Sequence, residues 1–476
     1  MHDTTWPLRH ALRHFPDRPA VVCGDIRLTF AELVSRCNRL GTGLRSRGVG
    51  TGDRVATLLT NSHRYLELHL AIPGIGALIV PLNSRLAVVE MAQVIDDAGA
   101  EVLVVDEAHA RLADKLADHV ARVIRIPDEY EALIDAADDV PLPGPPHEDH
   151  VAGLYYTGGT TGLPKGVMLT HRNHMANGIV TGYGLGLEPG DTLMYVFPLF
   201  HLGAIASIYI SVWQGVEQVF VPEVEPGRLL RTIQDERITA FAAVPTVLNF
   251  LLAHPDLPTT DLSSLRLVIH GGAPIAPDLC RRVADELGCA MMQAYGMTEA
   301  AAIVTLLRDE QELLDHERIT SGGQANIGVE VEVRRDDGTP CDAREAGEIV
   351  VRGPNVMPGY WNRPEETAAA LRDGWYWTGD VGFLDEEGYL FVVDRAKDMI
   401  VTGGENVYSV EVENALASHP DVFEVAVIGI PHDTWGEAVH AVVVPRPGTS
   451  PTEQDLISHC RASIAGYKTP KSIDLV

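Results

Sequence analysis

The sequence predicts an α/β protein: a large N-terminal domain of two α/β subdomains plus a β-rich subdomain, followed by a small α+β C-terminal domain. Its 476 residues exceed the length at which one hydrophobic core keeps growing, so at least two domains are expected. Short apolar runs alternate with helical patterns over residues 21–150 and again over 151–330, as in α/β units. From 331 to 360 short strands separated by turns replace that alternation, which predicts the β-rich subdomain.

The first subdomain is predicted from two strands, one helix and a connector. Residues 55–59 and 102–105 are continuous apolar runs of strand length. Residues 85–98 have helical spacing and end at Gly99, a common helix stop. Residues 141–146 are rich in proline, which predicts a surface link between subdomains rather than a recognition motif.

Similar patterns predict the remaining parts of the chain. Residues 267–269 are an apolar run that predicts a buried strand of the second subdomain. The C-terminal domain combines one predicted helix with two predicted strands, at residues 409–416, 422–428 and 438–444. We place the division between the domains after residue 394, which gives an N-terminal domain of residues 1–394 and a C-terminal domain of residues 395–476.

Composition narrows the class of protein. The formal net charge of −29 argues against nucleic acid or an anionic membrane as a main partner. The longest apolar run, residues 70–82, is interrupted by proline and glycine and is shorter than the roughly 20 residues that a membrane span needs. Residues 1–20 lack the apolar core of a secretory signal. The six cysteines are scattered without a C-x-x-C pair, which is typical of reduced thiols in a cytoplasmic protein.

A loop rich in glycine and threonine follows the apolar run 151–156. Glycines let backbone N–H groups approach an anion closely, threonine hydroxyls add donors, and Lys165 supplies a positive charge. A flexible turn is the alternative, but the density of these residue types favours phosphate binding. The loop is not a Walker loop, because no Gly-Lys-Ser/Thr follows the right gap. The predicted phosphate-binding residues are Thr157, Gly158, Gly159, Thr160, Thr161, Gly162 and Lys165.

Two further segments add groups suited to a nucleotide. Residues 270–274 follow a strand and offer small residues against which a flat ring could lie, although a tight strand–helix turn explains them equally. Residues 293–299 provide an aromatic face at Tyr295, a hydroxyl at Thr298 and a carboxylate at Glu299 that suits Mg²⁺. The alternative is that Thr298 caps a helix whose first turn contains Glu299.

Three more segments carry candidate chemistry. Asp380 follows a hydrophobic strand and could accept hydrogen bonds from ribose hydroxyls. Residues 394–400 combine several charges, which by themselves favour a solvated turn. His201 ends the segment 197–201, and a histidine after an apolar run is often a satisfied core residue. In the context of the other motifs we assign His201 to the active site.

Taken in this order, the motifs closely resemble those of the acyl-adenylate-forming superfamily, which contains acyl- and aryl-CoA ligases, beetle luciferases and peptide-synthetase adenylation domains. The likeness covers nearly the whole chain, and five separated motifs agree in sequence and order. Most members carry Ser where Gly158 stands, so one hydroxyl donor is absent here.

The resemblance implies a role for each motif. The loop from Thr157 to Lys165 would wrap the ATP triphosphate, Thr298 would touch the α-phosphate, and Glu299 would hold Mg²⁺. Lys397 would be the hinge about which a mobile C-terminal domain rotates between two half-reactions, and His201 would lie beside the reacting carboxylate. The remaining implied contacts are adenine at Gly271, Gly272, Ala273, Pro274, Ala294, Tyr295 and Gly296, ribose at Asp380 and Arg395, and the pantetheine of coenzyme A at Gly403 and Gly404.

The resemblance implies an ATP-dependent ligase that activates a carboxylic acid as acyl-AMP and then transfers the acyl group to coenzyme A. Residues 239–247 are apolar, which disfavours the amino-acid substrates of peptide-synthetase domains. A luciferase-like activity and a stand-alone adenylating enzyme that passes the acyl group to another acceptor are open alternatives. Whether the chain forms a homodimer is also open. The apolar pocket segments suit medium-chain fatty acids and phenylpropenoic acids alike.

One departure concerns the C-terminus. Members of the superfamily usually carry a lysine in a Gly-Lys context there, which contacts the carboxylate during adenylation. No such pair follows Lys468 and Lys471, which lie upstream of the expected position, so the role is not transferred to them. We expect the sequence to be truncated before that lysine. A nonenzymatic ATP- or AMP-binding protein is the alternative from a different functional class.

Overall fold

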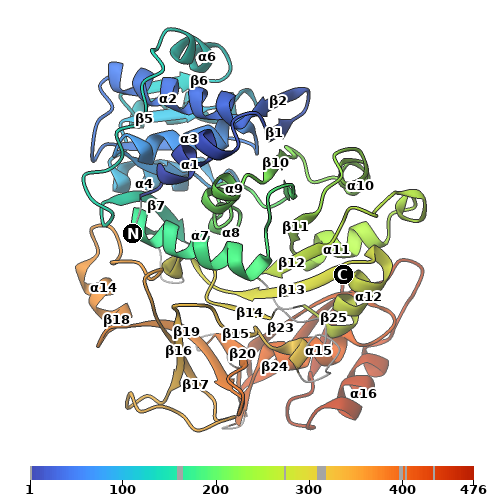
Figure 1. Ribbon diagram of the computed structural model, residues 1–476. Coiled ribbons are helices and arrows are strands. Elements are labelled where there is room, and N and C mark those ends of the chain that lie inside the picture. Colours follow the sequence, from blue (N-terminus) through green and yellow to red (C-terminus); the bar gives the residue numbers. More distant parts are fainter. Residues whose placement is uncertain are drawn as a thin grey trace.

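The computed structural model describes residues 3–157, 164–272, 275–307, 318–395, 400–402, 405–432 and 435–476, and its strands form four sheets (Figure 1). Three sheets belong to the large N-terminal part and one to the small C-terminal part, as the sequence predicts. No helix in the described ranges is long and apolar enough to cross a membrane. All six cysteines are described and none forms a disulfide, in agreement with the predicted thiols.

The first sheet has six strands in the order β6-β5-β3-β4-β7-β8. Its pairs are parallel except for the antiparallel pair of β7 and β8. Because both faces of β3, β4 and β5 are covered, these strands read as continuous apolar runs. The strands are β3 (Arg54–Leu58), β4 (Leu78–Pro81), β5 (Val102–Val105), β6 (Arg122–Arg125), β7 (Val151–Thr157) and β8 (Lys165–Thr170).

Helices accompany this sheet where the sequence predicts them. The predicted helix at 85–98 is α4, and it ends at Gly99, whose positive φ of 62° provides the left-handed helix stop. A capping box between Thr29 and Glu32 starts α2. The helices are α2 (Phe30–Ser46), α3 (His63–Gly74), α4 (Val88–Ala98), α5 (Ala110–Leu116) and α6 (Asp128–Asp135).

The second sheet has nine strands in the order β15-β14-β13-β12-β11-β9-β10-β1-β2. The central pairs from β10 to β13 are parallel, and the edge pairs are antiparallel. The strands are β1 (Pro19–Cys23), β2 (Ile26–Thr29), β9 (Thr192–Tyr195), β10 (Glu217–Phe220), β11 (Ala240–Ala243), β12 (Leu267–Gly271), β13 (Ala290–Tyr295), β14 (Thr305–Leu307) and β15 (Gln324–Ala325). The helices of this region are α1 (Trp6–His14), α7 (His171–Leu185), α8 (Leu202–Ile205), α9 (Ile208–Gln214), α10 (Pro226–Asp235), α11 (Pro245–Leu252) and α12 (Pro277–Leu287).

The predicted division of the α/β region near residue 150 is wrong. Strands β7 and β8 belong to the first sheet, and β1 and β2 form an edge of the second. The proline-rich segment 141–146 therefore leads from α6 to β7 of the same sheet, and it is not a surface link throughout, because Leu142 is buried against Gly41 and Gly74. Sheet membership follows from pairing between distant segments, which the local apolar pattern does not encode.

The third sheet is antiparallel and confirms the predicted β-rich subdomain. It contains β16 (Glu330–Arg334), β17 (Gly347–Arg352), β18 (Leu371–Arg372), β19 (Trp375–Leu384) and β20 (Leu390–Arg395), with α14 (Pro364–Ala370) beside it. The fourth sheet contains β21 (Ile400–Thr402), β22 (Glu405–Val407), β23 (Val422–His432), β24 (Gly436–Pro445) and β25 (Ser472–Leu475), with α15 (Ser409–Ala417) and α16 (Glu453–Ser463).

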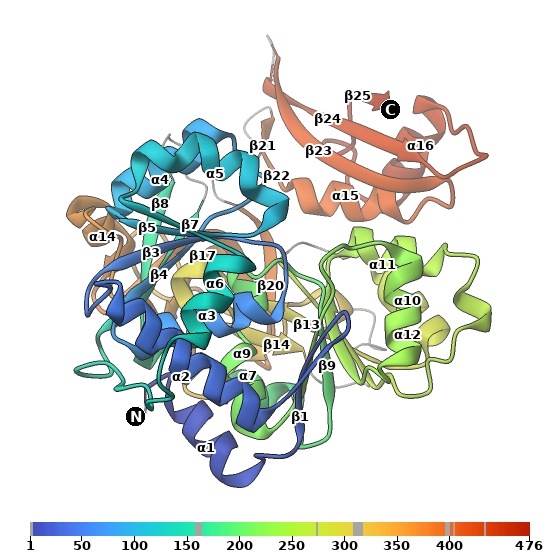
Figure 2. The same cartoon turned by 90° about the horizontal axis from the view of Figure 1, so that it is seen from above.

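The C-terminal sheet and its helices lie apart from the rest of the molecule (Figure 2). This region has its own apolar cluster, in which Val412, Val439 and Leu456 are fully buried. The ring of Phe423 on β23 contacts the ring of Phe250 on α11, with centroids 5.9 Å apart. The C-terminal unit is thus a small separate core that touches the N-terminal domain at α11.

Candidate active site

A cavity of about 740 Å³ opens where the three N-terminal sheets meet. The carboxyl ends of β7, β11, β12 and β13 point toward it, and β19 and α14 supply the opposite wall. Crevices at the carboxyl ends of parallel strands are the usual ligand sites of open α/β sheets. The position of the cavity follows from the fold.

Most of the described residues that the sequence predicts for the site line this cavity. They come from the phosphate-loop strands, from the ends of β12 and β13, from the segment after β9 and from β19. The sequence thus identifies groups up to 223 positions apart that share one space, as Thr157 and Asp380 show. The predicted site residues that line the cavity are Thr157, Lys165, His201, Gly271, Gly272, Ala294, Tyr295, Gly296, Thr298, Glu299 and Asp380.

Lys165 and Glu299 are linked by a tyrosine. The Tyr360 hydroxyl donates a hydrogen bond of 2.9 Å to Glu299 Oε1, and Lys165 Nζ lies 5.3 Å from the centroid of the same ring. The segment that carries Tyr360 runs beside β8, because Trp361 N–H donates to the Gly166 carbonyl at 2.7 Å. The strand that begins at Lys165 therefore also positions the partner of Glu299.

The backbone of Glu299 is fixed independently of its side chain. Glu299 lies in a 3₁₀ turn, Thr298–Ala300, and its carbonyl accepts from Met357 N–H at 2.8 Å. The turn is preceded by Met297, and Thr298 is its first residue, so the alternative in which Thr298 caps a helix is wrong. The Tyr376 hydroxyl hydrogen-bonds that of Tyr360, which extends the polar chain from Glu299 to β19.

Tyr295 and Asp380 form a second polar pair in the cavity wall. The Tyr295 hydroxyl donates to Asp380 Oδ2 at 2.8 Å. Asp380 does not follow its strand, as the sequence analysis expected, but lies inside β19 opposite Arg395 on β20. The strand continues through Asp380 because Gly379, with φ of +75°, absorbs an irregularity next to it. The Arg395 side chain lies outside the described part of the structure.

Two glycines that line the cavity beside Tyr295 are required by packing within the protein. Gly271, at the end of β12, pairs with Ala294, and a Cβ there would stand 2.9 Å from the Ala294 carbonyl oxygen. At Gly296 a Cβ would overlap the Ala302 carbonyl, so only glycine fits this packing. The result is a bare backbone surface next to an aromatic ring.

His201 lies at the opposite end of the cavity and is exposed to it, so the reading of a buried core histidine is wrong. Its Nδ1 accepts a hydrogen bond from Gly203 N–H at 3.1 Å, which leaves Nε2 to carry the proton of the neutral ring. Removal from bulk water by the surrounding residues, and then the charge of Arg85, lower the pKa of His201 below its ordinary 6.5. A neutral Nε2–H donor thus stands in the cavity wall.

A recess of about 50 Å³ extends the cavity beyond His201 and shares Phe197, Gly203 and Ala242 with it. Its walls are apolar except for a few hydroxyls. Ser207 Oγ donates to Tyr195 Oη at 3.2 Å, and Tyr195 Oη donates to Gln218 Oε1 at 3.1 Å.

Thr181 also lines the recess. It is 1% exposed, and its Oγ1 finds no hydrogen-bond partner among the described residues. An unpaired buried hydroxyl costs free energy unless a ligand or water satisfies it. The recess is thus an apolar space with hydroxyls in its wall.

Part of the predicted site cannot be placed. Ala273, Pro274, Lys397, Gly403 and Gly404, and the loop residues Gly158, Gly159, Thr160, Thr161 and Gly162, lie outside the described residues. Their predicted roles stay predictions.

The sequence analysis missed several residues of the cavity wall. Tyr360 and Tyr376 form the polar chain to Glu299, and Arg372 on β18 stacks on Trp377 with its guanidinium 3.8 Å from the ring centroid. The motif at 375–380 contains Tyr376 and Trp377, so the aromatic residues beside Asp380 were a usable signal. The paired aromatics at 360–361 were a second such signal.

Comparison with known proteins agrees with this geometry. The sequence profile described as AMP-binding enzyme matches residues 8–361, and the profile of the AMP-binding enzyme C-terminal domain matches residues 411–476. The chain belongs to the AMP-binding enzyme family.

Curated relatives of this AMP-binding enzyme match along almost its whole length. It is 44% identical to the feruloyl-CoA synthase of an Amycolatopsis species, over 99% of this chain and 94% of that protein. It is 35% identical to the long-chain-fatty-acid–CoA ligase FadD13 of Mycobacterium tuberculosis, over the same shares of the two chains.

A solved structure shares the fold. The o-succinylbenzoate CoA synthetase MenE of Bacillus subtilis, in complex with its acyl-adenylate, matches with a TM-score of 0.88 and 32% identity, over 99% of this chain and 94% of that one. A second structure of the same synthetase contains ATP and a magnesium ion. The predicted superfamily, the α/β fold and the class of an AMP-forming acid–thiol ligase that uses ATP, Mg²⁺ and coenzyme A are therefore confirmed.

Proposed function

We propose that this AMP-binding enzyme activates an aryl acid that carries an oxygen substituent on its ring, of the hydroxycinnamate class, and transfers it to coenzyme A. The observation that carries the proposal is the Thr181 hydroxyl, which has no partner among the described residues and lies in the wall of the apolar recess that Ser207 also lines. An alkyl chain has no group that can hydrogen-bond to these hydroxyls, whereas a phenolic oxygen can form hydrogen bonds with them.

The size and polarity of the recess support a ring rather than a long chain. A volume of about 50 Å³ gives room for roughly three to five water-sized groups, which suits a ring edge with its substituent. Burial raises the pKa of Tyr195 to about 12, so its hydroxyl stays neutral and keeps its bond to Gln218. The Ser207 oxygen, which donates to Tyr195, keeps lone pairs with which to accept from a phenol.

The relatives point in the same direction. The name of the Amycolatopsis relative, at 44% identity, describes an aryl acid, whereas the relative at 35% identity is named for long-chain fatty acids. Residues 240–247 contain no acidic side chain, and none of the described residues lines the recess with one, so a substrate ammonium group would find no counter-charge in the recess. The proposal therefore selects the phenylpropenoic acids from the two classes that the sequence leaves open.

The nucleotide end of the cavity suits ATP. We assign Lys165 and Thr298 to the phosphates, Glu299 to Mg²⁺, Tyr295 to adenine and Asp380 to the ribose. Among the described residues no three His, Cys, Asp or Glu side chains gather as a metal site. One carboxylate is sufficient for Mg²⁺, which is commonly held by one or two carboxylates together with substrate phosphates. When bound, Mg²⁺ neutralises negative charge on the phosphate oxygens.

The positions of these groups suit an in-line transfer. An oxygen of the substrate carboxylate forms a bond to the α-phosphorus of ATP while the bond to pyrophosphate breaks. The positive charge of Lys165 opposes repulsion between the two anions, and the His201 Nε2–H is available to orient the carboxylate. In the second half-reaction the sulfur of coenzyme A bonds to the acyl carbon, the thiol loses its proton, and AMP leaves with the electron pair of the broken bond.

We further propose that the domains divide after residue 394, with Lys397 as the hinge, Arg395 at the ribose, and Gly403 and Gly404 beside pantetheine. The separate core of the C-terminal domain and its limited aromatic contact at Phe250 support a unit that moves as a body. A cytoplasmic location and a homodimer are part of the same proposal, and size-exclusion chromatography with light scattering tests the homodimer.

A comparison of three acids tests the substrate class. Acyl-CoA formation from 4-hydroxycinnamate, cinnamate and octanoate is measured by mass spectrometry with ATP, Mg²⁺ and coenzyme A. We expect the highest kcat/KM for 4-hydroxycinnamate. Thr181→Val and Ser207→Ala should lower that value by roughly 2- to 10-fold, the worth of one neutral hydrogen bond, and leave cinnamate unchanged.

The matched control is Thr57→Val, which removes a fully buried hydroxyl of β3 that bonds Tyr65 away from the cavity. It should leave the ratio of the two cinnamates unchanged. A preference for octanoate, or an equal loss with cinnamate and 4-hydroxycinnamate in the Thr181 variant, would refute the aryl proposal.

A further inference from the structure

The segment between β9 and α8, residues 196–201, forms neither helix nor strand. It carries Phe197 and His201, which line the part of the cavity where the acid is proposed to bind, here called the acid end. Phe197 lines both the cavity and the recess, and His201 lines the cavity. The segment has one internal backbone bond, from His201 N–H to the Pro198 carbonyl at 2.9 Å, and its other backbone groups depend on bonds to their surroundings.

Asn61 supplies two bonds to the segment and a third to Tyr195, the last residue of β9. It lies between β3 and α3, and it is 7% exposed. Its Nδ2 donates to the carbonyls of Phe197, at 2.8 Å, and Tyr195, at 3.3 Å. Its Oδ1 accepts from Leu199 N–H at 2.8 Å. One side-chain amide thus replaces the neighbouring strand that the segment lacks.

His69 on α3 supplies a fourth bond. Its Nε2 lies 2.9 Å from the Leu199 carbonyl, and since a carbonyl only accepts, the proton must be on Nε2. The ring is completely buried, and its Nδ1 finds no partner in the part of the chain that the structure describes. Burial lowers the pKa of His69 to about 4, so the ring is neutral near pH 7.

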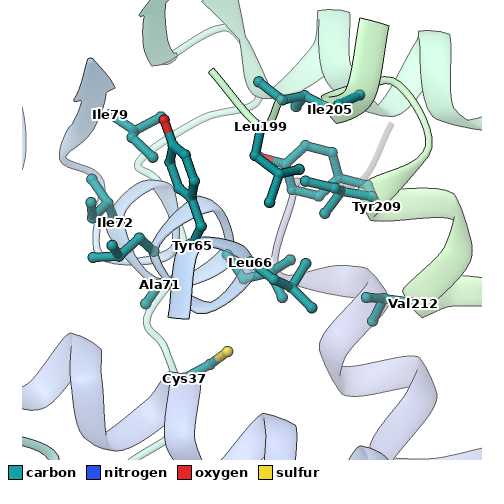
Figure 3. Packing of buried hydrophobic residues seen from close by; sticks show 14 of the residues in the cluster. Cys37, Tyr65, Leu66, Ala71, Ile72, Ile79, Leu199, Ile205, Tyr209 and Val212 are labelled. Atoms are coloured by element: carbon teal, nitrogen blue, oxygen red, sulfur yellow. The ribbon is translucent and has the colours of Figure 1, made fainter. Parts of the chain in front are cut away.

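The two side chains hold both polar groups of the Leu199 peptide. The Leu199 side chain is itself fully buried near Tyr209 and Ile205, beside the helix that carries Tyr65 and Leu66 (Figure 3). The Tyr209 hydroxyl closes the arrangement by donating to the His69 carbonyl at 3.1 Å. Asn61 and His69 belong to elements of the six-stranded sheet, whereas the segment continues β9 of the nine-stranded sheet.

We propose that Asn61 and His69 are positioning residues of the ligase reaction, which set the places of Phe197 and His201 at the acid end of the cavity from the neighbouring sheet. Neither side chain touches the cavity, so each acts only through the backbone of 195–199. A displacement of about 1 Å at a reacting group can cost on the order of 100-fold in rate. The inference rests on the proposed role of Phe197 and His201, and it does not depend on which acid is the substrate.

The separation of the acid end from the nucleotide end predicts that the kinetic parameters for the acid and for ATP respond differently to substitutions at Asn61 and His69, a difference here called the kinetic split. The nucleotide end is built from Tyr295, Glu299, Tyr360 and Asp380, which come from β13, the turn 298–300, the segment after β17, and β19, and not from the segment 196–201. Loss of Asn61 or His69 should therefore change the parameters for the acid and spare those for ATP. A purely structural role would lower stability and the active fraction without separating the two substrates.

The experiment measures acid-dependent exchange of pyrophosphate into ATP, with the acid that the wild-type enzyme uses fastest. Asn61→Ala and His69→Leu should lower kcat/KM for the acid at least tenfold and leave KM for ATP within twofold. His69→Gln, which keeps an N–H donor, should restore most of the loss. Asn61→Asp, which keeps the acceptor for Leu199 but not the donors, should resemble Asn61→Ala and serves if the alanine variant does not fold.

Asn38 offers a matched control. It is a buried asparagine of α2, 8% exposed, whose amide donates to Asp139 at 2.8 Å and accepts from Leu142 N–H at 3.2 Å, away from the cavity. Asn38→Ala should lower stability without the kinetic split. If it reproduces the split, or if the Asn61 and His69 variants change the acid and ATP parameters equally, the inference is wrong.

A variant of the site itself separates this inference from the proposed function. If His201→Ala leaves the kinetics of the acid unchanged, the assignment of the acid end fails. If His201→Ala impairs them while Asn61→Ala and His69→Leu do not, the acid end stands and the positioning role falls.

Discussion

Tyr360 and Glu299, 61 positions apart in the sequence, are joined by a hydrogen bond of 2.9 Å. The same tyrosine presents its ring to Lys165, so one side chain relates the proposed metal-binding carboxylate to the proposed phosphate-binding cation. Burial and the neighbouring carboxylate raise the pKa of Tyr360, which keeps it a hydrogen-bond donor at all working pH values. The donor fixes one oxygen of Glu299, a residue that lines the cavity.

Removal of this donor should weaken the use of magnesium. A hydrogen bond to a charged group contributes about 1.5–3 kcal/mol, so Tyr360→Phe should lower the rate of acyl-adenylate formation by about tenfold or more. The loss should be largest at low Mg²⁺, because the carboxylate is no longer held. Pyrophosphate release measured across a range of Mg²⁺ concentrations checks this expectation.

Tyr130→Phe is the matched control for Tyr360→Phe. The Tyr130 hydroxyl donates to a different carboxylate, Glu67, at 2.7 Å, within the first subdomain and away from the cavity. That variant should lose stability but keep the wild-type dependence on Mg²⁺. An identical dependence in the Tyr360→Phe variant and the wild type would contradict the assignment.

Glu299 itself should be far more sensitive. Glu299→Gln keeps the shape of the side chain but removes its charge, so we expect adenylation to fall by a factor of 100 or more, and Glu299→Ala should abolish it. The control variant is Glu366→Gln, because Glu366 is another carboxylate of the cavity wall, on α14. Pyrophosphate release near the wild-type rate in either Glu299 variant would exclude the role in magnesium binding.

The sequence predicts the residues that line the cavity better than the residues that hold the cavity wall in place. Lys165, Tyr295, Glu299 and Asp380 stand in motifs whose residue types reveal their chemistry, and all line the cavity. Asn61 lies in an ordinary loop, and its importance depends on a segment more than 130 positions away in the sequence. No local pattern encodes such a partnership.

The same distinction explains the errors in the fold. The strand at 102–105 was predictable because burial on both faces leaves a continuous apolar run. The assignment of β7 to the first sheet was not, because it depends on a parallel pairing of Gly153 with Ile79 across the helices and strands between them. Asp380 was placed after its strand because the glycine at 379 reads as a stop, whereas the strand bends there and continues.

The proposed ribose contact of Asp380 predicts a loss of discrimination between nucleotides. Asp380→Asn should raise KM for ATP by about tenfold, since a charged acceptor becomes a neutral one. Wild-type enzyme should use 3′-deoxy-ATP poorly, and the variant should use ATP and 3′-deoxy-ATP almost equally. Steady-state kinetics with both nucleotides give the answer, and an unchanged preference for ATP in the variant would remove Asp380 from the ribose site.

Four buried histidines should make the fold sensitive to mild acid. Burial, the largest cause in each case, lowers the pKa of His63, His69 and His171 to about 4 and that of His174 to about 3. Their pKa in the unfolded chain is near 6.5, so the unfolded state binds more protons as the pH falls below that value. Stability is therefore complete above pH 6.5 and declines as the pH falls toward 4.

Each of these histidines should contribute about 2 kcal/mol to the loss of unfolding free energy between pH 7 and pH 5. His174→Gln removes one titrating group. Between pH 7 and pH 5 this variant should therefore lose about 2 kcal/mol less unfolding free energy than the wild type. The effect of the substitution on absolute stability does not change this difference. His147→Gln, at a side chain that is 65% exposed, is the control substitution at the surface. Urea unfolding followed by fluorescence at both pH values measures the difference, and parallel losses in the His174 variant and the wild type would show that this ring is not kept neutral by burial.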